Sequence, residues 1–137
     1  MAKTLLIEWK ELGCKAHIQL LWDNAPKLCQ AVVDCLPLRS ISWHSVISGD
    51  NIGFVLPVVC TTFENPQPRN RGNMYIYANG QLGIVPYGDF SEPGDVNTFG
   101  RIDEKDMEDV AKAGRTVAEF FRKGPGRPIF ADISVAT

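Results

Sequence analysis

Glu64 is the residue of this sequence whose surroundings best suit proton transfer. It lies in a polar loop beside Phe63, which can desolvate the carboxylate, and beside Asn65, which can orient Glu64 or hold a substrate. His44 is the second candidate, because an imidazole exchanges protons near neutral pH. If Trp43 faces the core, strand alternation turns His44 to the opposite face. These residues predict acid–base catalysis by Glu64 with help from His44.

Arginine and aromatic side chains complete the candidate site. Arg69 and Arg71 share the loop of Glu64, and each guanidinium can bind a carboxylate through two parallel hydrogen bonds. Tyr87 can line a pocket and donate its hydroxyl, while Phe99 forms the floor of the pocket or part of the core. The predicted ligand is a small molecule that carries a carboxylate.

Each of these residues also has an ordinary structural interpretation. Glu64 can be a solvated carboxylate, with Asn65 forming a turn before the following proline. His44 can be an exposed or hydrogen-bonded side chain, Arg69 and Arg71 a solvated pair, and Tyr87 a packing residue. Under that interpretation the chain is a non-catalytic ligand-binding or protein-interaction module.

The sequence contains no motif that would bind a metal ion or a cofactor. Its histidines and cysteines do not have the spacing of metal ligands; the cysteines are Cys14, Cys29, Cys35 and Cys60. Walker and Rossmann glycine loops are absent. Cys60 borders a loop and is the best candidate for a reactive thiolate, but buried reduced thiols are the simpler expectation. We therefore expect no metal and no cofactor.

The hydrophobic pattern predicts many strands and two helices. The first helix is expected at about 24–36, with Asp23 or Asn24 as its N-cap. The second is expected to follow an N-cap at Asp103 and to end at Lys123, where Gly124 provides a left-handed C-terminal cap. The turn Asn79-Gly80 predicts a hairpin. Strands are expected at 3–9, 14–21, 39–47, 51–59, 73–78, 81–86, 98–102 and 127–135, with loops at 61–72 and 86–97. Without regular βαβ alternation, this order favours a mainly β fold, an antiparallel barrel capped by helices.

Composition narrows the function further. The 137 residues fit a single domain, 1–137, and the formal net charge of −2 offers no basic excess for nucleic-acid binding. No apolar run approaches the roughly 20 residues that span a bilayer, and no secretory signal precedes Glu8, so we expect a cytoplasmic protein without a membrane partner. A homo-oligomer is plausible, because a second subunit often covers the strand edges of small barrels.

Two short segments resemble the cyclophilin peptidyl-prolyl isomerases. Trp43-His44-Ser45-Val46-Ile47-Ser48-Gly49 is similar to their Phe-His-Arg-Val-Ile-Pro-Gly segment, and Phe99-Gly100-Arg101-Ile102 to their Phe-Gly-Arg-Val. The resemblance implies a closed antiparallel β-barrel of about eight strands capped by two α-helices. It also implies that Ser45 stands where the isomerases have their catalytic arginine. A neutral hydroxyl cannot replace a guanidinium, so prolyl isomerisation is not expected.

A longer resemblance, over most of the chain, is to a bacterial cyclophilin-like family of largely unknown function. It rests on the order and spacing of Ala25-Pro26-Lys27, Leu36-Pro37-Leu38, Phe63-Glu64-Asn65, Gly72–Tyr77 with Asn79-Gly80, Pro86-Tyr87-Gly88 and Val96–Phe99. Relatives of that family include cucumopine synthase, which joins histidine to 2-oxoglutarate in a cofactor-free Pictet–Spengler cyclisation. The resemblance implies acid–base chemistry on a small molecule without metal or cofactor, either proton abstraction or a ring closure like that of cucumopine synthase.

Overall fold

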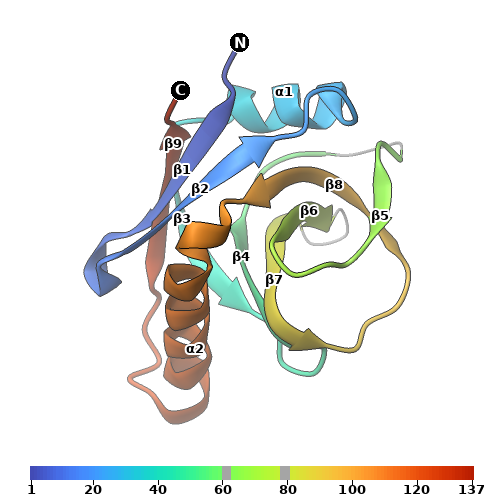
Figure 1. Ribbon diagram of the computed structural model, residues 1–137. Coiled ribbons are helices and arrows are strands. Elements are labelled where there is room, and N and C mark those ends of the chain that lie inside the picture. The colour runs from blue at the N-terminus through green and yellow to red at the C-terminus, as the bar shows by residue number, and fades with distance from the viewer. Residues whose placement is uncertain (60–62, 78–80) are drawn as a thin grey trace.

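The computed structural model describes residues 1–59, 63–77 and 81–137. In these residues the strands form one antiparallel sheet in the order β2-β1-β9-β3-β4-β7-β6-β8-β5, and a further pairing of β2 with β8 closes eight of them into a barrel. Figure 1 shows helix α1 at the top of the barrel and helix α2 at the bottom. The predicted mainly β barrel with two helices is confirmed, with β5 as an additional edge strand.

The strands and helices have the following bounds. The strands are β1 Thr4–Trp9, β2 Cys14–Leu20, β3 Leu38–His44, β4 Gly49–Val55, β5 Pro66–Pro68, β6 Asn73–Tyr77, β7 Leu82–Phe90, β8 Asp95–Ile102 and β9 Phe130–Val135. The helices are α1 Pro26–Asp34 and α2 Met107–Lys123, with short 3-10 turns at Lys10–Leu12 and Glu104–Asp106. No helix among the described residues is long and apolar enough to cross a membrane.

Alternation of side chains explains the barrel core. On β1 and β2 every second residue is buried, and the pairings Leu5 with Ile18 and Ile7 with Ala16 place apolar side chains opposite one another inside the barrel. The same alternation on β3 turns His44 inward, where it is 4% exposed, and Trp43 outward. The case considered from the sequence had Trp43 facing the core; in the structure the alternation holds, but His44 is the residue that faces the core.

The two predicted loops contain more strand than expected. Pro66–Pro68 pairs with β8 as an edge strand, a position that tolerates prolines because one side needs no backbone donors. Strands β7 and β8 extend to Phe90 and from Asp95, so most of the predicted loop 86–97 lies in the sheet. The predicted turn Asn79-Gly80 and the candidate thiol Cys60 lie outside the described residues. Cys14, Cys29 and Cys35 are free, and burial raises the pKa of Cys29 to about 11.

The helix boundaries differ from the predicted ones in their caps. Ala25, rather than Asp23 or Asn24, precedes α1 and provides no side-chain cap. A 3-10 turn separates Asp103 from α2, so Asp103 does not cap that helix directly. Gly124 has a positive φ of 92° but a ψ of 170°, which is an extended rather than a left-handed helical cap.

Candidate functional site

A histidine–tyrosine pair lies at the end of the barrel that α2 covers. His44 ends β3, and its Nε2 lies 2.6 Å from the hydroxyl of Tyr87 on β7, while its Nδ1 lies 2.7 Å from the carbonyl oxygen of Ser45. Both rings are buried, His44 to 4% and Tyr87 to 7% exposure, in an edge-to-face arrangement. The structure thus brings together two of the predicted site residues.

Burial keeps both members of this pair in their neutral forms near pH 7. Desolvation lowers the pKa of His44, and the positive charge of Arg122 lowers it further. The hydrogen bond to the Ser45 carbonyl and the negative charge of Asp50 raise it, but by less. Desolvation also raises the pKa of Tyr87 to about 12. The pair is therefore a neutral hydrogen-bonded unit that can accept or pass on a proton.

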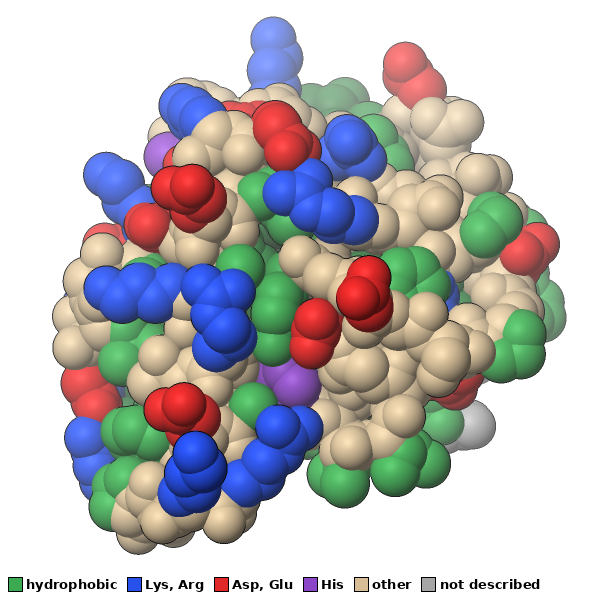
Figure 2. All heavy atoms as spheres, turned by 60° about the horizontal axis from the view of Figure 1, so that its bottom comes forward, with side chains coloured by type: hydrophobic (Ala, Val, Ile, Leu, Met, Phe, Trp, Pro, Cys, Tyr) green, Lys and Arg blue, Asp and Glu red, His purple; other side chains and the backbone are tan. Residues whose placement is uncertain are grey.

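The pair borders a hollow between α2 and the barrel, which we call the helix hollow. It has a volume of about 230 Å³. Figure 2 shows a histidine side chain inside it, between basic and acidic side chains. Its lining residues are His44, Asp50, Tyr87, Arg115, Ala118, Glu119 and Arg122.

Gly114 permits α2 to lie this close to Tyr87. A Cβ atom at position 114 would lie 2.2 Å from Cε1 of Tyr87, far inside the usual carbon–carbon contact distance. The helix therefore packs its glycine directly against the tyrosine ring. This contact holds the Tyr87 hydroxyl at the floor of the helix hollow.

Glu64 and Asn65 lie elsewhere, against α1. Oε1 of Glu64 accepts the backbone N–H of Leu28 at 2.8 Å, so it caps the first turn of α1. Asn65, at a φ of 52°, donates from Nδ2 to the carbonyl oxygen of Thr98 at 3.0 Å. Phe63 is 78% exposed, so most of its ring lies in solvent. The structure does not bring Glu64 together with His44.

The two loop arginines have different surroundings. The Arg69 side chain is 7% exposed, lies over the ring of Tyr75 and donates to the carbonyl oxygens of Pro93 and Gly94 at 2.8 and 3.1 Å. Arg71 forms an exposed ion pair with Glu104 and, with Tyr87, lines a cleft of about 500 Å³ beside the helix hollow. Phe99 is 1% exposed and belongs to the barrel core.

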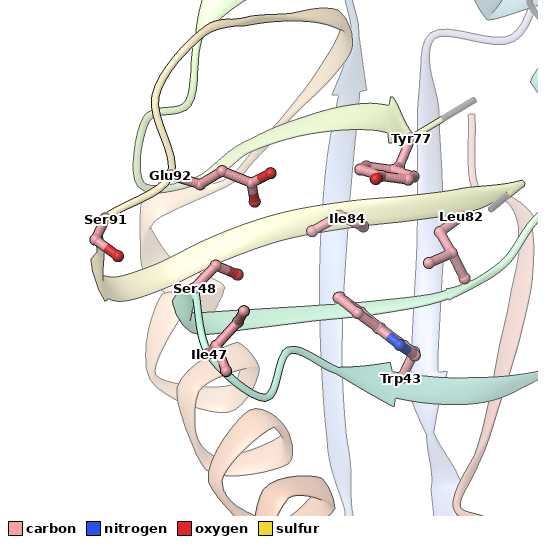
Figure 3. Close-up of a pocket in the computed structure, with 8 residues that line it drawn as sticks. All are labelled: Trp43, Ile47, Ser48, Tyr77, Leu82, Ile84, Ser91 and Glu92. Atoms are coloured by element: carbon pink, nitrogen blue, oxygen red, sulfur yellow. The ribbon is translucent and has the colours of Figure 1, made fainter. Parts of the chain in front are cut away.

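A second concave surface lies on the outer face of the barrel, and we call it the outer groove. It has a volume of about 470 Å³, and apolar side chains dominate its lining. In Figure 3 the Glu92 side chain extends over the groove toward Tyr77, and the ring of Trp43 lies on the opposite side of Ile84. The lining residues are Trp43, Ile47, Ser48, Tyr77, Leu82, Ile84, Ser91 and Glu92.

Arg69 holds the rim of the outer groove. Its Nη2 lies 3.5 Å from Oε1 of Glu92, and its other bonds fix Pro93 and Gly94, the residues that follow. The guanidinium is thus committed to the chain itself. It positions the carboxylate of Glu92 instead of binding a ligand carboxylate.

Sequence reasoning missed the residues that form these two surfaces. Trp43 and Tyr77 were assigned only to predicted strands, and Arg115 and Arg122 only to the last predicted helix. Two features of the sequence could have identified these residues. Trp43 is next to His44 on a strand, so the two side chains must face opposite sides of the sheet. Arg115 and Arg122 are seven residues apart on a helix, so they share one face of α2.

One described group has the donor atoms for a metal ion. Ligand atoms of His17, Asp103 and Asp106 lie within 4.8 Å of one another. Asp106 already accepts the backbone N–H of His17 at 2.8 Å and faces its Nδ1 at 2.9 Å. These bonds join β2 to the start of α2, which is a structural role.

Comparison with known proteins agrees with the barrel. McbB, solved in complex with tryptophan, is 21% identical with a TM-score of 0.84 over 95% of this chain, which spans 44% of the McbB chain. The hypothetical protein AF2241 from Archaeoglobus fulgidus is 20% identical, with a TM-score of 0.69 over 98% of this chain and 95% of that one. A cyclophilin-type peptidyl-prolyl cis-trans isomerase of Cryptosporidium parvum is 14% identical, with a TM-score of 0.65 over 100% and 99%.

These similarities establish the fold alone. A search of curated proteins finds no significant match. A family of proteins of unknown function, DUF3830, matches residues 7–112, which is most of the chain. The match includes the lining of the outer groove and ends within α2, before the four α2 residues that line the helix hollow. The chain therefore belongs to the DUF3830 family of proteins of unknown function, and its fold is that of the cyclophilins.

Proposed function

We propose that this protein binds a small molecule in the outer groove, and that the ligand combines a flat aromatic body with a cationic amino group. The observation that carries the proposal is the placement of one carboxylate, Glu92, over a groove with an apolar lining. Trp43 and Tyr77 offer ring faces to an aromatic ligand, and Ile84 forms the floor between them.

The charge at the rim selects the amino group. Glu92 is 42% exposed, and its ion pair with Arg69 is long, at 3.5 Å, so the carboxylate retains capacity for a second cation. Arg69 keeps the rim in place, which lowers the ordering cost when a ligand binds. Cation–π attraction between the amino group of the ligand and the rings of Trp43 and Tyr77 also favours binding of a cationic ligand.

The comparisons support this class of ligand. McbB, which shares the barrel, binds tryptophan, an aromatic molecule with an amino group. Cucumopine synthase, a relative of the family that the sequence resembles, also acts on an alkyl amine with an aromatic ring, histidine. We therefore propose alkyl amines that carry an aromatic ring as ligands. The proposed reaction is cofactor-free ring closure with a 2-oxo acid: the amine condenses with the keto carbon with loss of water, and the aromatic ring then forms the new carbon–carbon bond and loses a proton.

Prolyl isomerisation receives no support from the site. The Ser45 hydroxyl donates to the carbonyl oxygen of Gly49 within the β3–β4 connection, and Ser45 is 5% exposed. It offers neither the charge nor the reach of a guanidinium toward a peptide.

Isothermal titration calorimetry with tryptamine tests the binding proposal. We expect Trp43→Ala to abolish measurable binding and Glu92→Gln to weaken it about fivefold, because an exposed ion pair contributes up to about 1 kcal/mol. Glu108→Gln, an exposed carboxylate on α2, is the matched control and should bind as the wild type does. Indole, which lacks the amino group, should bind Glu92→Gln and wild type equally. Tryptamine binding that survives Trp43→Ala would contradict the proposal.

A separate assay tests the reaction. Tryptamine and 2-oxoglutarate are incubated with the protein, and the cyclised product is quantified by chromatography. We expect turnover above buffer for wild type and a loss for Glu92→Gln. If tryptamine binds but product forms only at the rate seen in buffer, the proposed enzymatic activity is wrong. The protein would then be a ligand-binding module.

A further inference from the structure

The hydrogen bonds of His44 determine where its proton lies. The carbonyl oxygen of Ser45 can only accept, so Nδ1 of His44 carries the hydrogen, and in the neutral ring Nε2 is an acceptor. The hydroxyl of Tyr87 must therefore donate to Nε2. While His44 is neutral, Tyr87 has no hydrogen left to donate into the helix hollow.

A proton on His44 would reverse this bond. With Nε2 protonated, His44 donates to the oxygen of Tyr87, and the hydrogen of Tyr87 becomes free to point elsewhere. Tyr87 lines the helix hollow, so the freed hydrogen can be donated to an acceptor inside it. The pair thus converts protonation of a buried imidazole into a new donor at the floor of the hollow.

Two cations border the same hollow. Arg115 and Arg122 line it from α2, and neither forms an ion pair or hydrogen bond with any residue that the structure describes. The facing charges are Asp50 from β4 and Glu119 from α2. Asp50 accepts the backbone N–H of Asp89 at 3.2 Å and favours a positive His44, whereas the charge of Arg122 opposes it.

We propose that the helix hollow is a second binding site, which takes a small carboxylate between Arg115, Arg122 and Tyr87, and that binding is coupled to proton uptake by His44. A carboxylate beside Arg122 offsets the positive charge that opposes protonation of the imidazole. The proton comes from solvent and binds Nε2, and the Tyr87 hydroxyl then donates to the bound carboxylate. The only bonds that change are the O–H bond of the solvent proton donor, which breaks, and the N–H bond at Nε2, which forms; no bond of the ligand's carbon skeleton changes.

This site is independent of the outer groove. His44 and Trp43 are consecutive on β3 and face opposite sides of the barrel wall, so a ligand in one site does not touch the lining of the other. A volume of about 230 Å³ suits a molecule of a few heavy atoms, and pyruvate is a suitable probe.

Nuclear magnetic resonance can follow the imidazoles directly, because the chain has only two histidines, His17 and His44. We expect saturating pyruvate to raise the pKa of His44. By reciprocity, pyruvate must then bind more tightly at low pH, by up to tenfold per pH unit for one proton. An unchanged His44 titration, or equal affinities at pH 5.5 and 7.5, would overturn the proposal.

Variants separate the parts of the site. Arg115→Gln with Arg122→Gln should weaken pyruvate binding at least tenfold, whereas Lys123→Gln, the matched control at the end of α2, should not. Tyr87→Phe removes the donor and should weaken the binding at pH 5.5 more than the binding at pH 7.5, so the pH dependence of the affinity becomes smaller. If Tyr87→Phe does not fold, the arginine variants and the wild-type titration still decide. Pyruvate binding unaffected by the double arginine substitution would refute the site.

Discussion

Replacement of Gly114 by alanine is a sensitive test of how α2 packs against the barrel. Helix propensity alone predicts that Gly114→Ala stabilises the protein by about 1 kcal/mol, because glycine is a poor residue for a helix interior. The structure predicts the opposite. The new Cβ would lie 2.2 Å from Cε1 and 2.5 Å from Cζ of Tyr87, so the ring or the helix must move by about 1.3 Å to restore ordinary contact.

The expected magnitude combines three contributions. Overpacking of a core costs about 1–3 kcal/mol, the propensity gain offsets about 1 kcal/mol of it, and loss of the bond between Tyr87 and His44 adds about 1 kcal/mol. We expect a net loss of about 1–3 kcal/mol in the free energy of unfolding.

Urea denaturation followed by circular dichroism measures this change. The same substitution is then measured in the Tyr87→Leu variant, which lacks the two ring atoms closest to the new Cβ. The difference between the two effects of Gly114→Ala gives the cost of the steric clash with the ring. In that background Gly114→Ala should be neutral or stabilising, so the double-mutant cycle should show a coupling of 1 kcal/mol or more. A stabilising effect of Gly114→Ala in the wild-type background would refute the packing of α2 on Tyr87.

Three further predictions concern Glu64, His44 and Ser45. Glu64→Ala should lower the free energy of unfolding by about 1 kcal/mol, since it removes the cap on Leu28, and Glu64→Gln should lose less; urea denaturation of both checks this. The lowered pKa of His44 means that its contribution to stability is complete above pH 6.5, the ordinary pKa, and declines as the pH falls below it. Stability measured at pH 7.5 and 5.0 should therefore fall more for wild type than for His44→Gln, and equal falls would contradict the neutral buried imidazole. A proline-peptide isomerisation assay should give the background rate, because Ser45 replaces the arginine; a rate above background would contradict this.

Local patterns in the sequence predicted most of the barrel. Strict alternation on Cys14–Leu20 and the apolar stripe of α2 correspond to observed elements, because each depends on one buried face. The exception was the polar, proline-containing stretch 61–72 and the stretch 86–97. Their strands depend on pairing across the sheet with residues far away in the chain, as Pro66 with Asn97, and no local pattern records that pairing.

The candidate site was harder to predict, because it depends on which residues meet in space. Neighbouring residue types singled out Glu64 and Arg69, yet the structure uses the first to cap α1 and the second to hold the Glu92 rim. His44 and Tyr87 were selected separately, and their hydrogen bond emerges only when β3 and β7 lie in one barrel. Whether a polar side chain has a structural role or can contact a ligand depends on the hydrogen-bond partners that other strands bring next to it.

Trp43 and His44 illustrate how far apart adjacent residues can be in chemical terms. The wall between the two concave surfaces is one strand thick, and β3 contributes a side chain to each. A point substitution on this strand can alter one surface and spare the other, so the two can diverge separately during evolution. An insertion or deletion of a single residue within β3 would instead exchange the two faces, placing an indole inside the barrel and an imidazole outside. We therefore expect the length of β3 to be far less tolerant of change than the identity of either residue.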